Sequence, residues 1–111
     1  MSHTPNLLLQ NVMPVGSRFD GSETIDIRIS DGEISEIGTE LNPKEHEETH
    51  DADGAYVSGG WMDMHVHLRE PGYEHKETIE TGCAAAAFGG FTEIACMPNT
   101  NPAIHTRDVV E

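Results

Sequence analysis

The chain has 111 residues, with six Lys and Arg against twenty Asp and Glu, which gives a formal net charge of −14. This length suits one ordinary domain or two small ones, and it is too short for a complete (β/α)8 barrel, which needs about 250 residues. The acidity argues against binding to nucleic acids or to anionic membrane surfaces, and it would suit a high-salt cytoplasm.

Cellular location is predicted from the cysteines and the amino terminus. Cys83 and Cys96 stand in apolar surroundings without the spacing of a paired motif, so we expect small buried hydrophobic residues in a reducing cytoplasm. Residues 1–5 contain neither a basic region nor a long apolar run, so no signal peptide is expected. No stretch approaches the roughly 20 apolar residues of a membrane helix.

The first part of the chain is predicted to form short β-strands. Residues 6–15 read as a strand that Pro14 ends or confines to a sheet edge. Residues 24–29 alternate Ile with polar side chains, which is the period of a half-buried strand. Asp31-Gly32 is a favoured pair for a type I′ turn, and residues 33–38 form the return strand of a hairpin.

Two polar stretches, residues 16–22 and 39–54, are predicted to be loops. The second contains His46 and His50 among several acidic residues, so a metal-binding cluster is one interpretation. We favour a solvated, mobile loop because no apolar frame would hold the ligands in place.

The composition changes at the glycines that follow this acidic stretch. Residues 55–57 are predicted to add one short strand, and Ser58-Gly59-Gly60 mark the change. We therefore expect a unit of β-strands at 1–57 and a second unit at 58–111.

Residues 63–72 are predicted to form a short buried strand that Pro71-Gly72 ends. Side chains alternate along a strand, so Asp63, His65, His67 and Arg69 would share one face. A hydrogen-bonded core histidine is the plain alternative. Three polar groups on one buried face favour a metal site instead, because imidazole is a common ligand of zinc and similar ions.

A helix and a second strand are predicted next. Thr78 can cap a helix that ends at Gly89-Gly90, and Gly82 marks a close approach within it. Residues 91–97 read as a buried strand, and residues 103–111 begin another helix with Thr106 as its cap.

This strand–helix–strand order predicts a βαβ unit with parallel strands and a right-handed crossover. Functional sites of such units lie at the carboxyl ends of the strands. We therefore expect His67 and Arg69, after the first strand, to face Asn99, after the second, across one mouth.

Two segments resemble the class I dihydroorotases of the amidohydrolase superfamily. Residues 59–72 read GGWMDMHVHLREPG and look like the first-strand signature, while GGFT at 89–92 and MPNTNP at 97–102 match the second block. The resemblance implies the amino-terminal part of a metal-dependent (β/α)8 TIM-barrel hydrolase, an α/β fold, preceded by strands of a small β-sandwich. The barrel would be incomplete in this chain.

The resemblance also implies roles for four residues. His65 and His67 would be ligands of a one- or two-zinc site, and Arg69 and Asn99 would hold the substrate carboxylate. The implied reaction is the reversible hydrolysis of dihydroorotate to N-carbamoyl-aspartate in pyrimidine synthesis. Glu70 is expected to brace the turn, while Asp63 is either a strand-end hydrogen-bonding carboxylate or a support for the ligands.

The remaining metal ligands and the catalytic aspartate of the family come from later strands, which would lie beyond Glu111. We therefore expect an inactive amino-terminal fragment that binds metal weakly. Implied partners are the small-molecule substrate and either further copies of the chain or other pyrimidine-pathway enzymes. Three alternatives remain open. They are a non-catalytic dihydroorotase-like scaffolding protein, an allantoinase- or hydantoinase-type enzyme, and a small β-module that binds a partner through its sheet edges.

Overall fold

The computed structural model describes residues 5–16 and 19–111, which divide after Ser58 into two compact units. The predictions for residues 1–4, and for residues 17–18 of the first loop, lie outside the described residues. Within those described ranges no helix is long and apolar enough to cross a bilayer.

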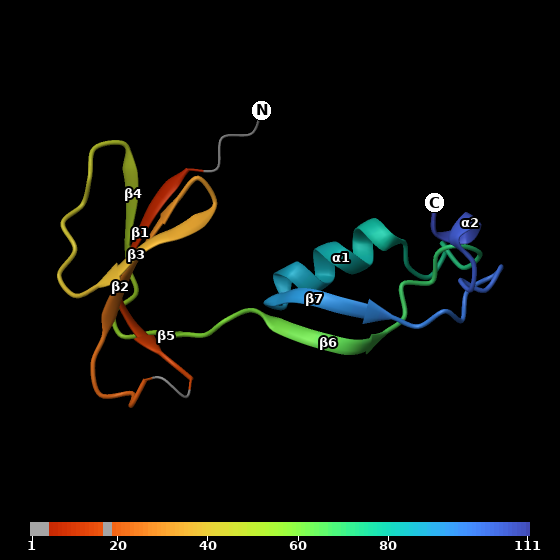
Figure 1. Cartoon of the computed structure of the whole chain (residues 1–111), viewed down its shortest axis with the longest axis horizontal. Coiled ribbons are helices and arrows are strands. Elements are labelled where there is room, and N and C mark those ends of the chain that lie inside the picture. Colours follow the sequence, from red (N-terminus) through yellow and green to blue (C-terminus); the bar gives the residue numbers. More distant parts are fainter. Residues whose placement is uncertain (1–4, 17–18) are drawn as a thin grey trace. The chain divides into compact units, whose positions relative to one another are not determined.

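The first unit is one five-stranded sheet (Figure 1). Its strands are β1 (Asn6–Pro14), β2 (Ile25–Ser30), β3 (Glu33–Gly38), β4 (Glu47–Asp51) and β5 (Tyr56–Val57). The order is β3-β2-β1-β4, and β5 pairs with the end of β1. The predicted strands are confirmed. Pro14 is the last residue of β1, which is central rather than an edge strand.

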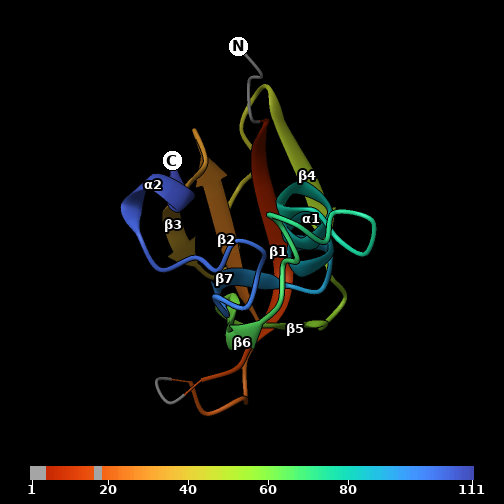
Figure 2. The same cartoon turned by 90° about the vertical axis from the view of Figure 1, so that its right-hand side faces the viewer.

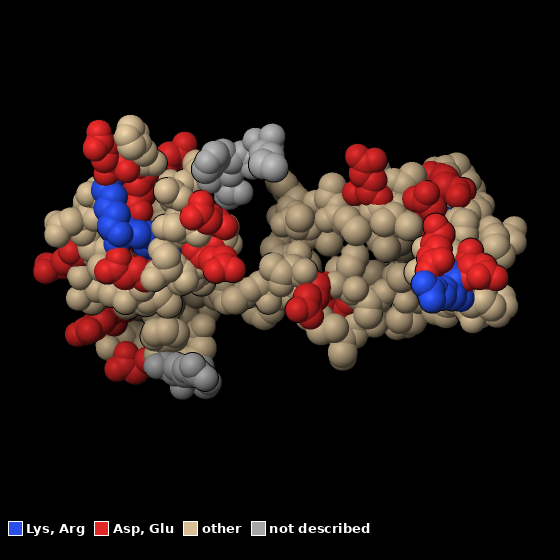
Figure 3. Space-filling model, turned by 45° about the horizontal axis from the view of Figure 1, so that its top comes forward, with Lys and Arg blue, Asp and Glu red and all other residues tan. Residues whose placement is uncertain are grey.

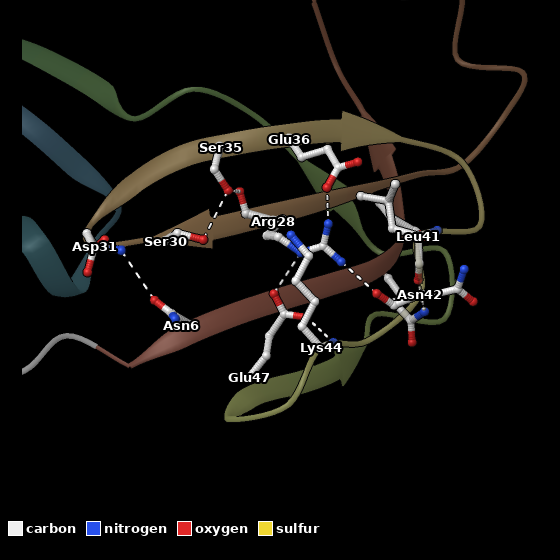
Figure 4. A network of polar contacts seen from close by, with 12 residues as sticks. Asn6, Arg28, Ser30, Asp31, Ser35, Glu36, Leu41, Asn42, Lys44 and Glu47 are labelled. Carbon is white, nitrogen blue, oxygen red and sulfur yellow. Dashed lines mark hydrogen bonds and ion pairs between the residues drawn. The ribbon is translucent and has the colours of Figure 1, made fainter.

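The predicted hairpin between β2 and β3 is also confirmed. Asp31 and Gly32 have φ angles of 53° and 81°, the paired positive values of a type I′ turn. The Asp31 N–H donates to the side-chain oxygen of Asn6 over 3.3 Å (Figure 4). The turn is thereby tied to the start of β1.

The prediction of one long loop over residues 39–54 is wrong. Strand β4 lies in this segment and pairs in parallel with β1, with Asn6 opposite Glu47 and Gln10 opposite Asp51. Four of its five residues are exposed, so it carries no apolar alternation, and its strand conformation comes from backbone pairing.

Leu8, Val12 and Ile27 form the small apolar core of the first unit, with exposures of 0%, 4% and 8%. Asp26 is buried beside them and is fully bonded. Its two carboxylate oxygens accept the backbone N–H groups of Asn11, at 2.9 Å, and Leu41, at 2.8 Å. Asp26 therefore anchors the segment after β3 to the core sheet.

Arg28 is the second buried charge of this unit, with only 3% exposure. Its guanidinium donates to Glu36 on β3, to Glu47 on β4 at 2.8 Å, and to the carbonyl of Asn42 at 2.6 Å (Figure 4). Removing one partner of such a buried pair is costly, because the remaining charge stays buried without compensation. Arg28 thus links three segments of the sheet.

The second unit is a strand–helix–strand–helix segment (Figure 1). It consists of β6 (Trp61–Val66), α1 (Ile79–Phe88), β7 (Phe91–Cys96) and the short α2 (Arg107–Val110). Strands β6 and β7 are parallel, and α1 packs along β7. The predicted parallel unit is confirmed. The terminal helix is shorter than predicted and begins after Thr106.

Helix α1 begins and ends as its sequence predicts. Thr78 and Thr81 form a reciprocal capping box, in which each hydroxyl accepts the other's backbone N–H at 3.0–3.1 Å. Gly82 lies against Leu68, since an added Cβ would stand 2.5 Å from a leucine methyl. The close approach predicted for Gly82 is confirmed.

The predicted burial of the second unit is wrong. Trp61, Met62 and Met64 on β6 are exposed by 61%, 55% and 72%, and both Cys83 and Cys96 are exposed. The physical reason is that β6 has β7 as its one paired neighbour, and α1 contacts β7 alone among the described strands.

Candidate functional site

Strand β6 is shorter than predicted, and its pairing with β7 is irregular. Asp63 pairs with Ile94 and Val66 with Cys96, so three steps along β6 match two along β7. The strand ends at Val66, which puts His67 and Arg69 in the following loop. The predicted strand is therefore too long at its carboxyl end, and the register shift interrupts its regular period.

The loops after β6 and β7 lie against each other at the carboxyl ends of the two strands (Figure 2). The Met97 N–H donates to the Val66 carbonyl at 2.8 Å, and the Asn101 N–H donates to the Pro71 carbonyl at 3.0 Å. Gly72, at a φ of 99°, is so close to Asn101 that any Cβ would overlap its backbone oxygen. The expected shared mouth is thus present.

His65, His67 and Asn99 lie together at this mouth. The two imidazole rings have centroids 5.2 Å apart in an edge-to-face arrangement. Nδ1 of His67 is 2.9 Å from Oδ1 of Asn99. Asp63 accepts the backbone N–H of His65 at 2.9 Å, which is the strand-end hydrogen bond weighed for this carboxylate.

Arg69 follows directly but makes no such contact. Its guanidinium has no ion pair or hydrogen bond with another residue in the described ranges, and its backbone is left-handed, with a φ of 65°. Asp and Glu are spread over the visible face of each unit, while Lys and Arg occupy few places (Figure 3). A cation without an internal partner is what an anionic ligand would need in so acidic a protein.

The loop that carries Arg69 is fixed at its far end by carboxylates. Glu70 accepts the backbone N–H of Ile79 at 2.7 Å, so it satisfies one of the unpaired N–H groups at the start of α1. The bracing role predicted for Glu70 is confirmed. Glu74 accepts the Gly72 N–H at 2.9 Å, and this bond lowers the pKa of Glu74 below its ordinary value. Both contacts hold the turn after the histidines in place.

The donors present suit half of a zinc site. His65 and His67 offer two imidazoles, whereas structural and catalytic zinc sites use three or four protein ligands. Among the described residues no group of three or more His, Cys, Asp or Glu is placed to hold a metal. Two histidines therefore fit zinc as a partial ligand set that further ligands would have to complete.

The carboxylate at the end of the chain is engaged locally. Glu111 accepts a hydrogen bond from Nε of Arg107 at 2.5 Å, and both side chains are largely exposed. An exposed pair of this kind contributes little to stability. We give Glu111 no catalytic role, and the catalytic groups expected beyond Glu111 stay a prediction, so no catalytic residue is assigned within the chain.

A cavity lies elsewhere in the second unit. It measures about 190 Å³ between α1 and β7, and it is lined by Cys83, Ala86, Ala87, Phe91, Thr92, Glu93 and Ile94. None of the four predicted site residues lines it, and its walls are mainly apolar. The polar side chains of His65, His67 and Asn99 converge at the loop mouth instead.

Sequence reasoning missed the bond between His67 and Asn99. It assigned Asn99 to the substrate alone, although the rule that parallel strands end at one edge already placed the two residues together. The sequence does not give the distance between the two side chains. Spacing along the chain predicts that His67 and Asn99 are neighbours, but not that they form a hydrogen bond.

Comparison with known proteins gives consistent relatives. A family model described as dihydro-orotase-like matches residues 54–111. Dihydroorotase from Anoxybacillus flavithermus is 52% identical over 86 residues, covering 78% of this chain and 20% of the relative. Dihydroorotase from Geobacter metallireducens is 46% identical over 97 residues, covering 87% and 23%.

Solved structures agree in fold. An L-hydantoinase (dihydropyrimidinase) from Arthrobacter aurescens matches with a TM-score of 0.80 and 32% identity, over 96% of this chain and 23% of that one. A dihydroorotase structure matches with a TM-score of 0.51 and 37% identity, over 62% and 18%. The chain spans about a fifth of the length of the curated relatives it matches. With more than half of its residues matched by the family model, the chain belongs to the dihydro-orotase-like family.

Proposed function

We propose that this chain supplies the first metal ligands and part of the substrate site of a zinc-dependent dihydroorotase. The observation that carries the proposal is the convergence of His65, His67 and Asn99 at the mouth formed by the two loops. The second unit would be the first βαβ segment of a (β/α)8 barrel, and the first unit would contribute strands of a small β-sandwich. The domain limits are proposed at 1–57 and 58–111.

In this proposal His65 and His67 hold zinc through imidazole nitrogens. The bound metal would supply Lewis-acid catalysis for the addition of water to an amide. Arg69 would pair with the substrate carboxylate through two N–H groups, and the Asn99 amide would donate to the same group. Water added across the ring amide C–N bond of dihydroorotate gives N-carbamoyl-aspartate, and ring closure releases that water again.

A hydantoinase-type enzyme is the second candidate, because an L-hydantoinase gives the TM-score of 0.80. Arg69 favours dihydroorotate, which carries a carboxylate for the guanidinium to bind. Intact His65, His67, Arg69 and Asn99 also argue against a scaffold without activity.

The test is a chimera in which this chain replaces the matching segment of the A. flavithermus dihydroorotase. We expect the chimera to bind zinc and to interconvert dihydroorotate and carbamoyl-aspartate. His65→Ala and His67→Ala should each lower activity by more than about 100-fold. Replacing a residue that only hydrogen-bonds to a metal ligand can already cost that much, so losing the ligand itself should cost more. The 111-residue chain by itself should show no turnover and only weak zinc binding.

His75→Ala is the matched control, because His75 is an exposed loop residue outside the proposed ligand set. Arg69→Ala should impair turnover of dihydroorotate much more than that of an uncharged hydantoin. Full activity after replacing both histidines would refute the metal assignment. Turnover of hydantoins but not of dihydroorotate would favour the second candidate.

A further inference from the structure

We propose that Asn99 is a positioning residue for His67, which it holds in the tautomer that carries its proton on Nδ1. This proposal rests on the proposed function in one respect only, which is that Nε2 of His67 would bind zinc. The tautomer is a property of the chain itself, and it can be measured without metal or substrate.

The geometry fixes the pair through backbone contacts on both sides. The side-chain bond spans 2.9 Å between Nδ1 and Oδ1. On the amino-terminal side of the pair, the Val66 carbonyl accepts the Met97 N–H. On the carboxyl-terminal side, the Pro71 carbonyl accepts the Asn101 N–H. Since the two loops are anchored at both flanks, the side chains meet with little freedom left to lose.

The chemistry of the two groups decides where the proton lies. An amide oxygen only accepts hydrogen bonds, so the ring nitrogen that faces it must carry the proton. The Nε2 atom of a neutral His67 then keeps its lone pair, which is the form that binds a metal. The NH2 group of Asn99 retains two donors, so the side chain can serve His67 and an anionic ligand at once.

The experiment measures the tautomer by long-range 1H–15N correlation spectra of histidine-labelled 111-residue chain, without metal, at about pH 8.5, where an ordinary histidine is neutral. We expect the Nδ1–H form for His67 in the wild-type chain. Asn99→Leu removes the acceptor and should raise the Nε2–H population severalfold. Asn99→Asp keeps an oxygen acceptor and should restore the wild-type pattern.

Two references separate positioning from general disturbance. Asn101→Ala removes an amide from the same loop and should leave the His67 spectrum unchanged. His105, whose Nδ1 lies 2.7 Å from the Ala103 carbonyl, should stay Nδ1–H in every variant. Backbone amide spectra check folding, and Asn99→Ala replaces the leucine variant should that one unfold.

A wild-type His67 protonated at Nε2 overturns the proposal, as does an unchanged tautomer in Asn99→Leu or, if that variant unfolds, in Asn99→Ala. A switch in Asn99→Asp overturns it too, because the amide NH2 group would then have faced the ring. In the chimera, zinc should bind about 10- to 100-fold more weakly to the Asn99→Leu variant than to the unsubstituted protein. Tautomer shifts as expected in the 111-residue chain, with unchanged zinc binding in the chimera after replacing both His65 and His67, would support positioning while refuting the proposed metal function.

Discussion

At the scale of single residues, Arg69 is where conformation and chemistry conflict. A non-glycine residue in the left-handed region costs about 1–2 kcal/mol, and Arg69 has no local side-chain hydrogen bond in the described structure to offset that cost. Such residues persist where the surrounding structure holds them, and here the Tyr73 N–H donates to the Arg69 carbonyl at 2.9 Å and closes the turn.

A pair of substitutions tests this strain. Arg69→Gly and Arg69→Ala both remove the guanidinium, but only alanine keeps a Cβ in the left-handed conformation. We expect the glycine variant to be more stable by about 1 kcal/mol in urea unfolding. The same comparison at Ala85, an exposed position within α1, should have the opposite sign at a similar magnitude. If alanine were the more stable residue at both positions, Arg69 would not be strained.

At the scale of elements, the sequence predicted those parts whose signals are local. The type I′ turn at Asp31-Gly32 and the cap at Thr78 depend on side-chain chemistry within a few residues. Strand β4 was missed because its residues are polar and its conformation comes from pairing with β1, about forty positions away in the chain.

The candidate site was predicted in part for the same reason. The meeting of His67 with Asn99 follows from the parallel order of the two strands, which the sequence pattern predicted. The shift of register between Asp63 and Val66 depends on how β6 fits β7, and no spacing in β6 alone reveals it. The burial predicted for the second unit was wrong because periodicity predicts only which face of a strand or helix is apolar. The exposure of that face depends on which other elements cover it.

Helix α1 offers a test of its capping box. Thr78→Ala removes the hydroxyl that accepts the Thr81 N–H at 3.1 Å, and it should lower the free energy of unfolding by about 1 kcal/mol. Thr78→Ser should restore most of that loss. Thr106 is the matched control, because it occupies the N-cap of α2 without a side-chain hydrogen bond, so Thr106→Ala should be close to neutral. Equal losses at both threonines would contradict the capping interpretation.

At the scale of the whole molecule, stability depends on pH through a few carboxylates that accept hydrogen bonds. Asp20, Glu47, Asp51 and Glu74 all have a pKa below the ordinary value, and each accepts hydrogen bonds. The backbone N–H of Lys44 is the main cause at Glu47, followed by Arg28. A carboxyl whose pKa is lower in the folded chain binds protons preferentially when unfolded, so its stabilisation is complete above the unfolded pKa and is lost as pH falls through the folded one.

Asp51 allows this dependence to be isolated. The Asn11 side-chain amide donates to it at 2.9 Å and is the main cause of its lowered pKa, and the Asp53 N–H adds a second bond. The urea midpoint of the wild-type chain should hold from neutral pH to about pH 5 and then fall, and Asp51→Asn should be less stable at neutral pH with a shallower fall. Glu48→Gln, on the same strand, changes the net charge equally without removing a side-chain bond seen in the described residues, so its acid dependence should follow the wild type. A wild-type midpoint that stayed constant down to about pH 2.5 would contradict this linkage. A fall equally steep in the wild type and in Asp51→Asn would ascribe the acid sensitivity to net charge alone.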